Sequence, residues 1–195
     1  MRLFFALELS DLVKEDLQLL IGKLRPRVRG VRWVEPRAMH LTLRFLGEVE
    51  ADQLGPLCAA ARLAAAEAPS LSLRTDGLGM FPGKGRPKVI WVAVESDEEK
   101  LQALQAGLEE ALHNARFGRQ DHPFSPHLTL GRVEWGADPR RDLEGVQAPP
   151  PRRFETGEFL LVESRLGPAG SHYEIRCRFP LGAAHRAARP GGGRA

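Results

Sequence analysis

Long apolar runs and cysteines are scarce in this sequence, and each scarcity excludes a class of protein. No stretch approaches the roughly 18 uncharged apolar residues that a membrane span needs. The first apolar run meets Glu8 too soon for the ~7–15-residue core of a signal peptide, so we expect a cytoplasmic protein. The two cysteines, Cys58 and Cys177, lack a metal-type spacing and lie in apolar company. We expect free thiols in the core rather than a disulfide.

Composition and charge indicate a soluble body followed by a basic tail. Hydrophobic residues make up 43% and charged residues 27% of the 195 residues, as in ordinary globular proteins. The net charge is +3, and residues 182–195 hold three arginines and no acid, so the rest of the chain is balanced. We expect one domain over residues 1–181 and a disordered Arg/Gly tail over residues 182–195.

Positive charge is concentrated locally within this balanced body. Seven basic residues and one acid lie between Lys23 and Arg44, and a smaller group follows at Lys84, Arg86 and Lys88. Such clusters contact phosphates in nucleic-acid-binding proteins, but they also occur as ordinary solvated faces. Charge alone leaves both interpretations open.

Hydrophobic periodicity predicts an α+β protein built from antiparallel strands. Ser10 is placed to cap a first helix that ends before Pro26, and Ser96 with Glu99 has the form of a capping box before a leucine-striped helix. A third, alanine-rich helix is predicted over residues 52–68. The predicted strands cover residues 2–8, 31–34, 40–46, 71–78, 89–94, 127–133, 154–164 and 173–179.

One tetrapeptide occurs twice, and strand geometry gives the repeat a meaning. His40-Leu41-Thr42-Leu43 returns as His127-Leu128-Thr129-Leu130, each time in a predicted strand. Because side chains alternate along a strand, each His/Thr pair shares one face and each Leu pair shares the other. The leucines would anchor both strands in a core. If the two halves pack with approximate two-fold symmetry, two imidazoles and two hydroxyls meet in one cleft.

Those groups suit phosphoryl chemistry without a metal. Near neutral pH one imidazole can accept a proton while the other donates one, which hydrolysis of a phosphodiester requires. Thr42 and Thr129 can donate hydrogen bonds to phosphate oxygens, and Arg132 is a candidate to stabilise the transition-state charge. Structural histidines, a metal site and threonines that merely favour strands are the competing interpretations. Neither motif contains a carboxylate.

The paired motifs resemble those of the 2H phosphoesterase superfamily, in its branch of RNA 2′,3′-cyclic phosphodiesterases, also called 2′-5′ RNA ligases. The resemblance extends over about residues 2–181. It is carried by the segments around the two motifs, residues 32–47 and 124–132, and by shorter matches at residues 81–82, 89–92, 163–164 and 172–174.

The resemblance implies a bilobal fold with two pseudo-symmetric lobes of antiparallel sheet, helices on the outer faces and a central active-site cleft. It implies hydrolysis of a terminal 2′,3′-cyclic phosphate on RNA to a 2′-phosphomonoester. His40 would be the proton donor to the 3′ oxygen, and His127 the proton acceptor that activates water. The spacing does not itself fix that allocation, because the two motifs are nearly identical. No metal or organic cofactor is implied.

RNA with a 2′,3′-cyclic phosphate end is therefore the expected partner, since only ribose has the 2′ hydroxyl that forms this ester. We expect a monomer with no membrane association and no obligatory protein partner. Arg44 in the basic run and Phe124 are possible RNA contacts, although Phe124 could equally belong to the core. Two alternative functions remain open: a 2′-5′ ligase acting on ends like those of tRNA halves, and a non-catalytic RNA-binding module.

Overall fold

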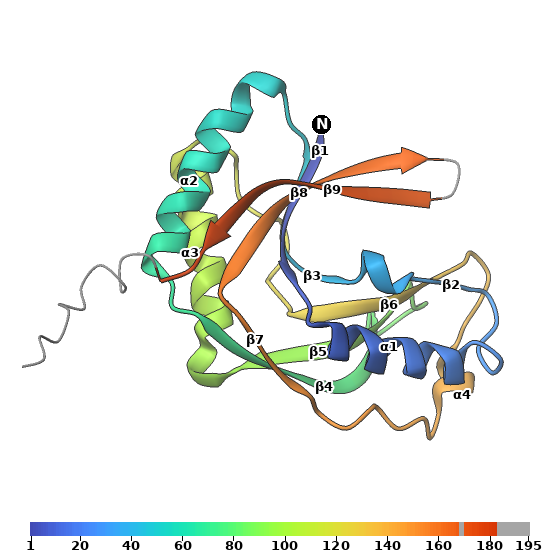
Figure 1. Cartoon of the computed structure of the whole chain (residues 1–195). Helices are drawn as coiled ribbons and strands as arrows, with labels where there is room; N and C mark the ends of the chain where they lie inside the picture. Colours follow the sequence, from blue (N-terminus) through green and yellow to red (C-terminus); the bar gives the residue numbers. More distant parts are fainter. Residues whose placement is uncertain (168–169, 183–195) are drawn as a thin grey trace, which may run out of the picture.

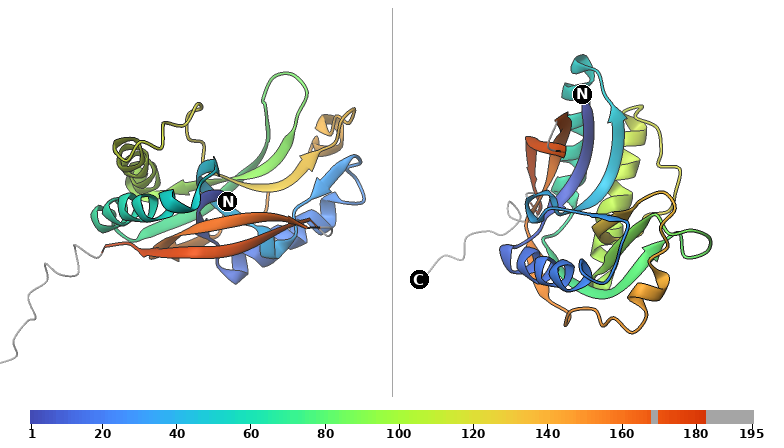
Figure 2. Two further views of the ribbon diagram at one scale, coloured as in Figure 1. Left: turned by 90° about the horizontal axis from the view of Figure 1, so that it is seen from above. Right: turned by 90° about the vertical axis from the view of Figure 1, so that its right-hand side faces the viewer.

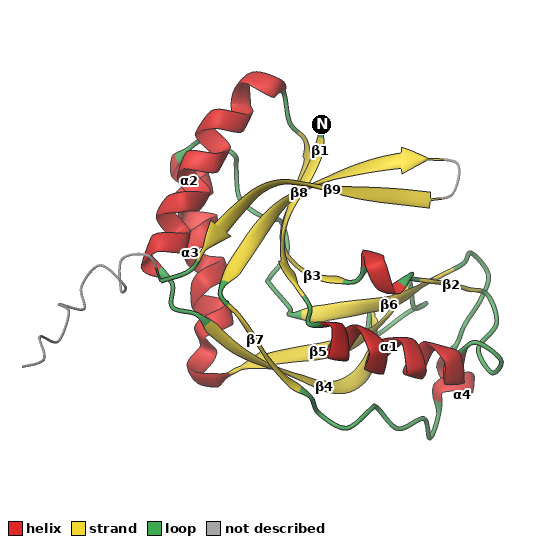
Figure 3. Cartoon of the chain, in the orientation of Figure 1, coloured by secondary structure: helices red, strands yellow, loops and turns green. Residues whose placement is uncertain are grey.

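The strands form one curled antiparallel sheet of nine strands, flanked by helices (Figures 1 and 3). The structure is a computed structural model that describes residues 1–167 and 170–182. Its helices are α1 (Asp11–Leu24), α2 (Leu54–Glu67), α3 (Lys100–Asn114) and the short α4 (Arg140–Leu143). Its strands are β1 (Arg2–Glu8), β2 (Val31–Trp33), β3 (His40–Glu48), β4 (Leu71–Phe81), β5 (Val89–Ser96), β6 (His127–Val133), β7 (Arg153–Thr156), β8 (Glu158–Gly167) and β9 (Gly170–Pro180).

The strand order divides the sheet into two halves that meet at the two motif strands. The path runs β7-β4-β5-β6-β3-β1-β8-β9, and β2 pairs separately with β6. The motif strands β3 and β6 are joined by a single register pair, Leu41 with Leu128. Each of them has an antiparallel neighbour on its other side, β1 for β3 and β5 for β6. The α+β fold with two related halves is confirmed.

Alternation along the strands separates a core face from an open face. Leu41, Leu43, Leu128 and Leu130 are buried in the main core, together with apolar residues of α1, α2 and α3. The intervening positions of both motif strands face the other way and are only half-buried. Because the period of a strand is two, the leucines fix each histidine and threonine on the opposite face.

The connection between β7 and β8 explains the curl of the sheet. The single strand predicted over residues 154–164 is wrong, because the segment forms two strands separated by Gly157. β7 pairs with β4 and β8 pairs with β1, so one residue links strands from opposite ends of the path. A flat sheet would hold these two strands far apart, and the one-residue link therefore requires the ends to approach each other. Strand patterns alone do not reveal this break, because β-branched and aromatic residues, Phe154, Thr156 and Phe159, lie on both sides of Gly157.

Two helix starts illustrate where local signals succeed and fail. The Ser10 side chain accepts a hydrogen bond from the backbone N–H of Val13, so the predicted cap of α1 is confirmed. The predicted capping box at Ser96 is wrong. Glu98 and Glu99 have left-handed backbone angles, α3 begins at Lys100, and the Ser96 hydroxyl accepts from the N–H of Leu101 instead. A short acidic 3-10 turn thus replaces the expected first helical turn.

The two cysteines are free thiols, as expected, yet they lie side by side. Their sulfur atoms are 3.0 Å apart, joining α2 to β9 across 119 residues of sequence. Burial and the neighbouring Cys177 raise the pKa of the Cys58 thiol to about 12, which keeps it protonated. Most of the predicted tail, residues 183–195, lies outside the described residues. Gly182 is described, and its N–H donates to the carbonyl of Ala68.

No helix among the described residues has the length and apolar character needed to cross a membrane.

Candidate active site

Each motif strand has a β-bulge, and the bulge changes which of the later side chains lie on the open face. In β3 the pairing with β1 skips Leu43, and in β6 the pairing with β5 skips Leu130. Two consecutive residues of each strand therefore turn toward the core, and the faces exchange beyond the bulge. Arg132 consequently shares the open face with His127 and Thr129. The matching residue beyond the bulge of β3 is Phe45.

The open faces of both halves line one cavity of about 520 Å³. Five residues predicted from the sequence contribute to its wall: His40, Thr42, His127, Thr129 and Arg132. Since β3 and β6 lie beside each other in the sheet, both motifs reach this cavity from adjacent strands. The structure therefore brings together the groups that the repeat predicted to meet.

Each histidine is oriented by the same backbone contact. Nδ1 of His40 is 2.8 Å from the carbonyl oxygen of Ala38, and Nδ1 of His127 is 2.7 Å from that of Ser125. A carbonyl only accepts hydrogen bonds, so Nδ1 of each ring carries a hydrogen and donates it. This leaves Nε2 of both rings free for proton transfer in the cavity.

Aromatic side chains support both imidazoles. The ring of Phe4 stacks on His40 with a centroid distance of 4.7 Å, and Tyr173 of β9 meets His40 edge-on at 5.3 Å. Phe81 meets His127 edge-on at 5.0 Å. These contacts limit ring rotation and hold the free nitrogens in place.

The two histidines differ in electrostatic environment. Burial, reinforced by the positive charges of Arg132 and His127, lowers the pKa of His40 to about 4, although its hydrogen bond to Ala38 opposes the shift. His40 is therefore uncharged at neutral pH. An anion bound beside it would favour the charged form and raise this pKa again.

The charge of the cavity wall favours an anionic ligand. Arg2, Arg32 and Arg132 line it together with the two histidines, and no aspartate or glutamate of the described residues belongs to its wall. Arg32 and Arg132 lie opposite each other in the β2–β6 register. Among the described residues no group of three His, Cys, Asp or Glu side chains is close enough to bind a metal ion.

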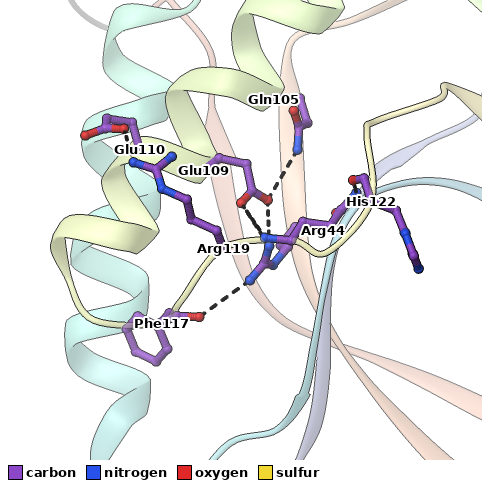
Figure 4. A network of polar contacts seen from close by, with 8 residues as sticks. Arg44, Gln105, Glu109, Glu110, Phe117, Arg119 and His122 are labelled. Carbon is purple, nitrogen blue, oxygen red and sulfur yellow. Dashed lines mark hydrogen bonds and ion pairs between the residues drawn. The ribbon is translucent and has the colours of Figure 1, made fainter.

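Arg44 does not reach the cavity, although it follows the first motif directly. The bulge turns it toward α3, where it is buried and forms two hydrogen bonds of 2.8 and 3.0 Å with the carboxylate of Glu109 (Figure 4). Gln105 and the backbone N–H of Gln120 donate to the same carboxylate. Arg44 thus joins β3 to α3, and this geometry gives no support to an RNA contact.

Phe124 also lies away from the cavity wall. It is partly buried and packs against the main core, the alternative that the sequence left open. Sequence reasoning missed two aromatic residues that do line the cavity, Phe45 and Tyr173, with exposed fractions of 60% and 40%. Aligning the two motifs could have found Phe45, because it follows His40 by five positions, as Arg132 follows His127.

A larger groove of about 670 Å³ lies between α2 and α3, away from the motifs. Its wall is mostly alanine, leucine and proline, and its polar members are Glu67, Glu110 and Asn114. It contains no histidine, arginine, cysteine or hydroxyl that could catalyse a reaction. The smaller cavity between the two halves is therefore the candidate active site.

Comparison with known proteins agrees with the paired motifs and the fold. A family match described as the 2′-5′ RNA ligase superfamily extends over residues 13–168. The chain belongs to the 2′-5′ RNA ligase superfamily. One curated member, from Thermus thermophilus, is 39% identical over 95% of this chain and 92% of its own length. Another, from Thermotoga maritima, is 33% identical over 93% of this chain and 97% of its own. Both are named RNA 2′,3′-cyclic phosphodiesterase.

Solved structures of this superfamily show the same architecture. TT0787 of Thermus thermophilus aligns with a TM-score of 0.75 at 33% identity, over 95% of this chain and all of that one. Escherichia coli LigT, solved in complex with 3′-AMP, aligns with the same TM-score at 28% identity, over 92% of this chain and 97% of that one. As a member of the superfamily, the chain is an enzyme of the cyclic phosphodiesterase kind.

Proposed function

We propose that this protein hydrolyses the 2′,3′-cyclic phosphate at the 3′ end of RNA, leaving a 2′-phosphomonoester, by two-histidine acid–base catalysis without a metal. The observation that carries the proposal is the cavity whose described wall has two imidazoles, each with Nδ1 on a carbonyl and Nε2 left for proton transfer, and three arginines without a carboxylate. The names of the relatives supply the cyclic ester as substrate. The 2′ hydroxyl that the ester requires makes the substrate RNA rather than DNA.

The reaction is a displacement at phosphorus with two proton transfers. His127 accepts a proton from water at Nε2 while the water oxygen bonds to phosphorus. The bond from phosphorus to the 3′ oxygen breaks, and His40 donates a proton to that oxygen. The hydroxyls of Thr42 and Thr129 donate to the non-bridging oxygens, and Arg132 stabilises the negative charge that develops on them.

The low pKa of His40 sets a condition on this scheme. With a pKa of about 4, His40 is uncharged at neutral pH, so its Nε2 cannot donate until it acquires a proton. The negative charge of the bound phosphodiester, placed between His40 and Arg132, raises the pKa of His40 and recharges it. The acid would thus be generated by the substrate on which it acts.

The difference between the halves gives the terminal nucleoside a location. Arg132 supplies charge on one side of the histidines, and its counterpart Phe45 supplies an exposed ring on the other, near Phe4 and Tyr173. A base can stack on such rings, whereas the phosphate needs the arginine. We therefore place the base against Phe45 and the phosphate between the motifs.

Both motifs come from one chain, so the site needs no second copy, and we propose a monomer that acts on RNA in the cytoplasm. Size-exclusion chromatography with light scattering tests the first part. A dimer that loses activity on dilution would contradict it.

The decisive experiment is analysis of the phosphate end of an RNA with a 2′,3′-cyclic phosphate, incubated with purified protein in excess EDTA. Conversion to a 2′-phosphate supports both the hydrolysis and the 3′ leaving group. Conversion only after a divalent metal is added contradicts the metal-free mechanism. RNA binding with no conversion under either condition contradicts hydrolysis and favours the binding module. A second RNA with a 5′ hydroxyl, included in the same reaction, detects joining, because ligation is the same displacement of the 3′ oxygen with the 5′ hydroxyl in place of water.

A further inference from the structure

A fully exposed tryptophan lies just beyond the arginine end of the cavity. Trp135 has an exposed fraction of 96%, the highest among the exposed large hydrophobic residues of the part of the chain that the structure describes. The guanidinium carbon of Arg86 lies over its indole ring, 5.5 Å from the centroid. Exposing a whole indole forgoes the free energy that its burial would contribute, so the core does not account for its presence here.

Three segments distant in sequence meet around this tryptophan. The N–H of Glu134 donates to the carbonyl of Gly30 at 2.8 Å, and that of Val133 donates to the carbonyl of Lys88 at 2.9 Å. The loop before β2 and the loop between β4 and β5 therefore both reach the end of β6. The β4–β5 hairpin rises well above its surroundings in the left view of Figure 2, beside the segment that follows β6.

Positive charge gathers at the same place. The loop before β2 carries Arg29, and the β4–β5 loop carries Lys84, Arg86 and Lys88, all exposed. None of these four forms an ion pair with another described residue. Two acids flank the tryptophan, Glu134 and Asp138, and Asp138 is paired with Arg140. The cations thus outnumber the acids and remain available.

We propose that Trp135, Arg86, Lys84 and Arg29, together termed the Trp135 platform, bind the single-stranded RNA that precedes the cyclic phosphate. An aromatic ring for base stacking beside cations for phosphates is the combination that binds single strands without sequence preference. This inference rests on the proposed function, because the cavity must hold the 3′ end for the preceding nucleotides to reach the platform.

Strand geometry sets how far the RNA must extend. Trp135 follows Arg132 by three residues, and an extended chain advances at most about 3.6 Å per residue, which gives ~11 Å. A stacked nucleic-acid strand rises about 3.4 Å per nucleotide, so Trp135 lies within roughly three nucleotide steps of Arg132. The strand can leave the cavity only toward its 5′ side, because the cyclic phosphate ends the chain. Because the terminal base lies against Phe45, on the other side of the histidines from Arg132, a mononucleotide leaves the platform unoccupied. The nucleotides that precede it run back past Arg132 to the platform, and a tetranucleotide supplies three of them.

The test compares kcat/KM for a nucleoside 2′,3′-cyclic phosphate with that for a tetranucleotide ending in the same group. Wild type should prefer the tetranucleotide. Trp135→Ala should lower kcat/KM for the tetranucleotide about tenfold, because it removes the ring on which one base stacks, and should change the mononucleotide value less than about twofold. Arg86→Ala should make kcat/KM for the tetranucleotide less sensitive to salt. The slope of log kcat/KM against log salt concentration should fall by about one, because one fewer phosphate is neutralised.

Two substitutions on α2 serve as matched controls. Leu63→Ala removes an exposed apolar side chain and Arg62→Ala removes an exposed cation, and neither residue lines the active-site cavity. Both variants should keep the length preference of wild type. Equal rates of wild type on both substrates, or equal losses of Trp135→Ala on both, would overturn the platform. So would an unchanged Trp135→Ala, which points to a protein partner instead.

A binding measurement separates this inference from the proposed function. Single-stranded RNA without a cyclic end should quench tryptophan fluorescence in wild type, and Trp135→Ala should abolish most of the quenching. If no cyclic substrate is hydrolysed but this quenching is observed, hydrolysis fails and the platform stands. If cyclic mononucleotides are hydrolysed and no quenching or length preference is found, the platform fails and hydrolysis stands.

Discussion

At the scale of single residues, backbone hydrogen bonds determine which nitrogen of each motif histidine can transfer a proton. His40 and His127 are copies of one motif, and each donates through Nδ1 to the carbonyl two residues earlier in the chain. Both uncharged rings therefore have the same tautomer, with the hydrogen on Nδ1 and with Nε2 left for proton transfer. The difference between the rings comes from burial and charge, which lower the pKa of His40 to about 4.

The acid and base assignments can be separated by changing the leaving atom. His40→Ala and His127→Ala should each lower kcat by about 10²–10⁴-fold on the normal cyclic substrate. A substrate with sulfur in place of the 3′ oxygen needs little protonation, because a thiolate leaves readily. It should restore most activity to His40→Ala and little to His127→Ala. The measurement is steady-state kinetics of both variants on both substrates. Rescue of His127→Ala alone would reverse the assignment of acid and base.

The low pKa of His40 should also make folding stability depend on pH. The unfolded chain binds a proton at His40 below about pH 6.5, whereas the folded chain binds it only near pH 4. The contribution of His40 to the free energy of unfolding is therefore fully present above pH 6.5. It declines as the pH falls toward 4, with a slope of at most about 1.4 kcal/mol per pH unit. Urea unfolding between pH 7.5 and 4.5 should give a shallower decline for His40→Gln than for wild type. Identical declines would contradict the low pKa.

At the scale of elements, the bulges in β3 and β6 decide which side chains enter the active site. A regular strand would place Arg44 beside Thr42 on the open face, because residues two apart share a face. The bulge at Leu43 instead sends Arg44 to α3 and Phe45 to the cavity. The equivalent bulge at Leu130 sends Gly131 to the core side and Arg132 to the cavity.

The ion pair between Arg44 and Glu109 should contribute to stability rather than to catalysis. Arg44→Met leaves the Glu109 carboxylate buried without its cation, which should cost about 3–5 kcal/mol of unfolding free energy. The double variant Arg44→Met with Glu109→Leu should recover most of this loss, since no lone charge remains. Urea denaturation measures both. Arg74→Met, which breaks an exposed pair with Glu95, is the control and should cost much less, because water screens that pair. An Arg44→Met loss no larger than the control would contradict the structural role.

At the scale of the whole molecule, the candidate active site lies where the two halves of the sheet meet. A single register pair joins β3 to β6, so the cavity lies at the joint between the halves, and it receives one histidine from each. Arg2 and Tyr173, close to the two ends of the described chain, line the same cavity. The site thus depends on closure of the whole sheet.

The wall residues that the structure describes all lie between positions 2 and 173. Deleting residues 183–195 should therefore leave kcat/KM on a cyclic mononucleotide unchanged. The comparison needs only the full chain and the shortened chain, matched by circular dichroism for folding. A loss of more than about tenfold would show that the deleted segment belongs to the site.

Much of this protein could be predicted from local patterns. Period-two alternation in the strands and the leucine stripe of α3 gave the α+β class, because burial of apolar side chains dictates both patterns. The repeated motif identified His40, Thr42, His127 and Thr129 as a set, because residues two apart in a strand share a face. These inferences need only the geometry of a single element.

The tertiary structure alone decided what depends on contacts between distant residues. A bulge is a mismatch between two strands, so neither β3 nor β6 by itself reveals that Phe45 rather than Arg44 faces the cavity. The division of residues 153–167 between opposite ends of the sheet likewise depends on which partners each strand finds. The burial that lowers the pKa of His40, and the meeting of Trp135 with Arg86, arise only when segments far apart in the chain come together.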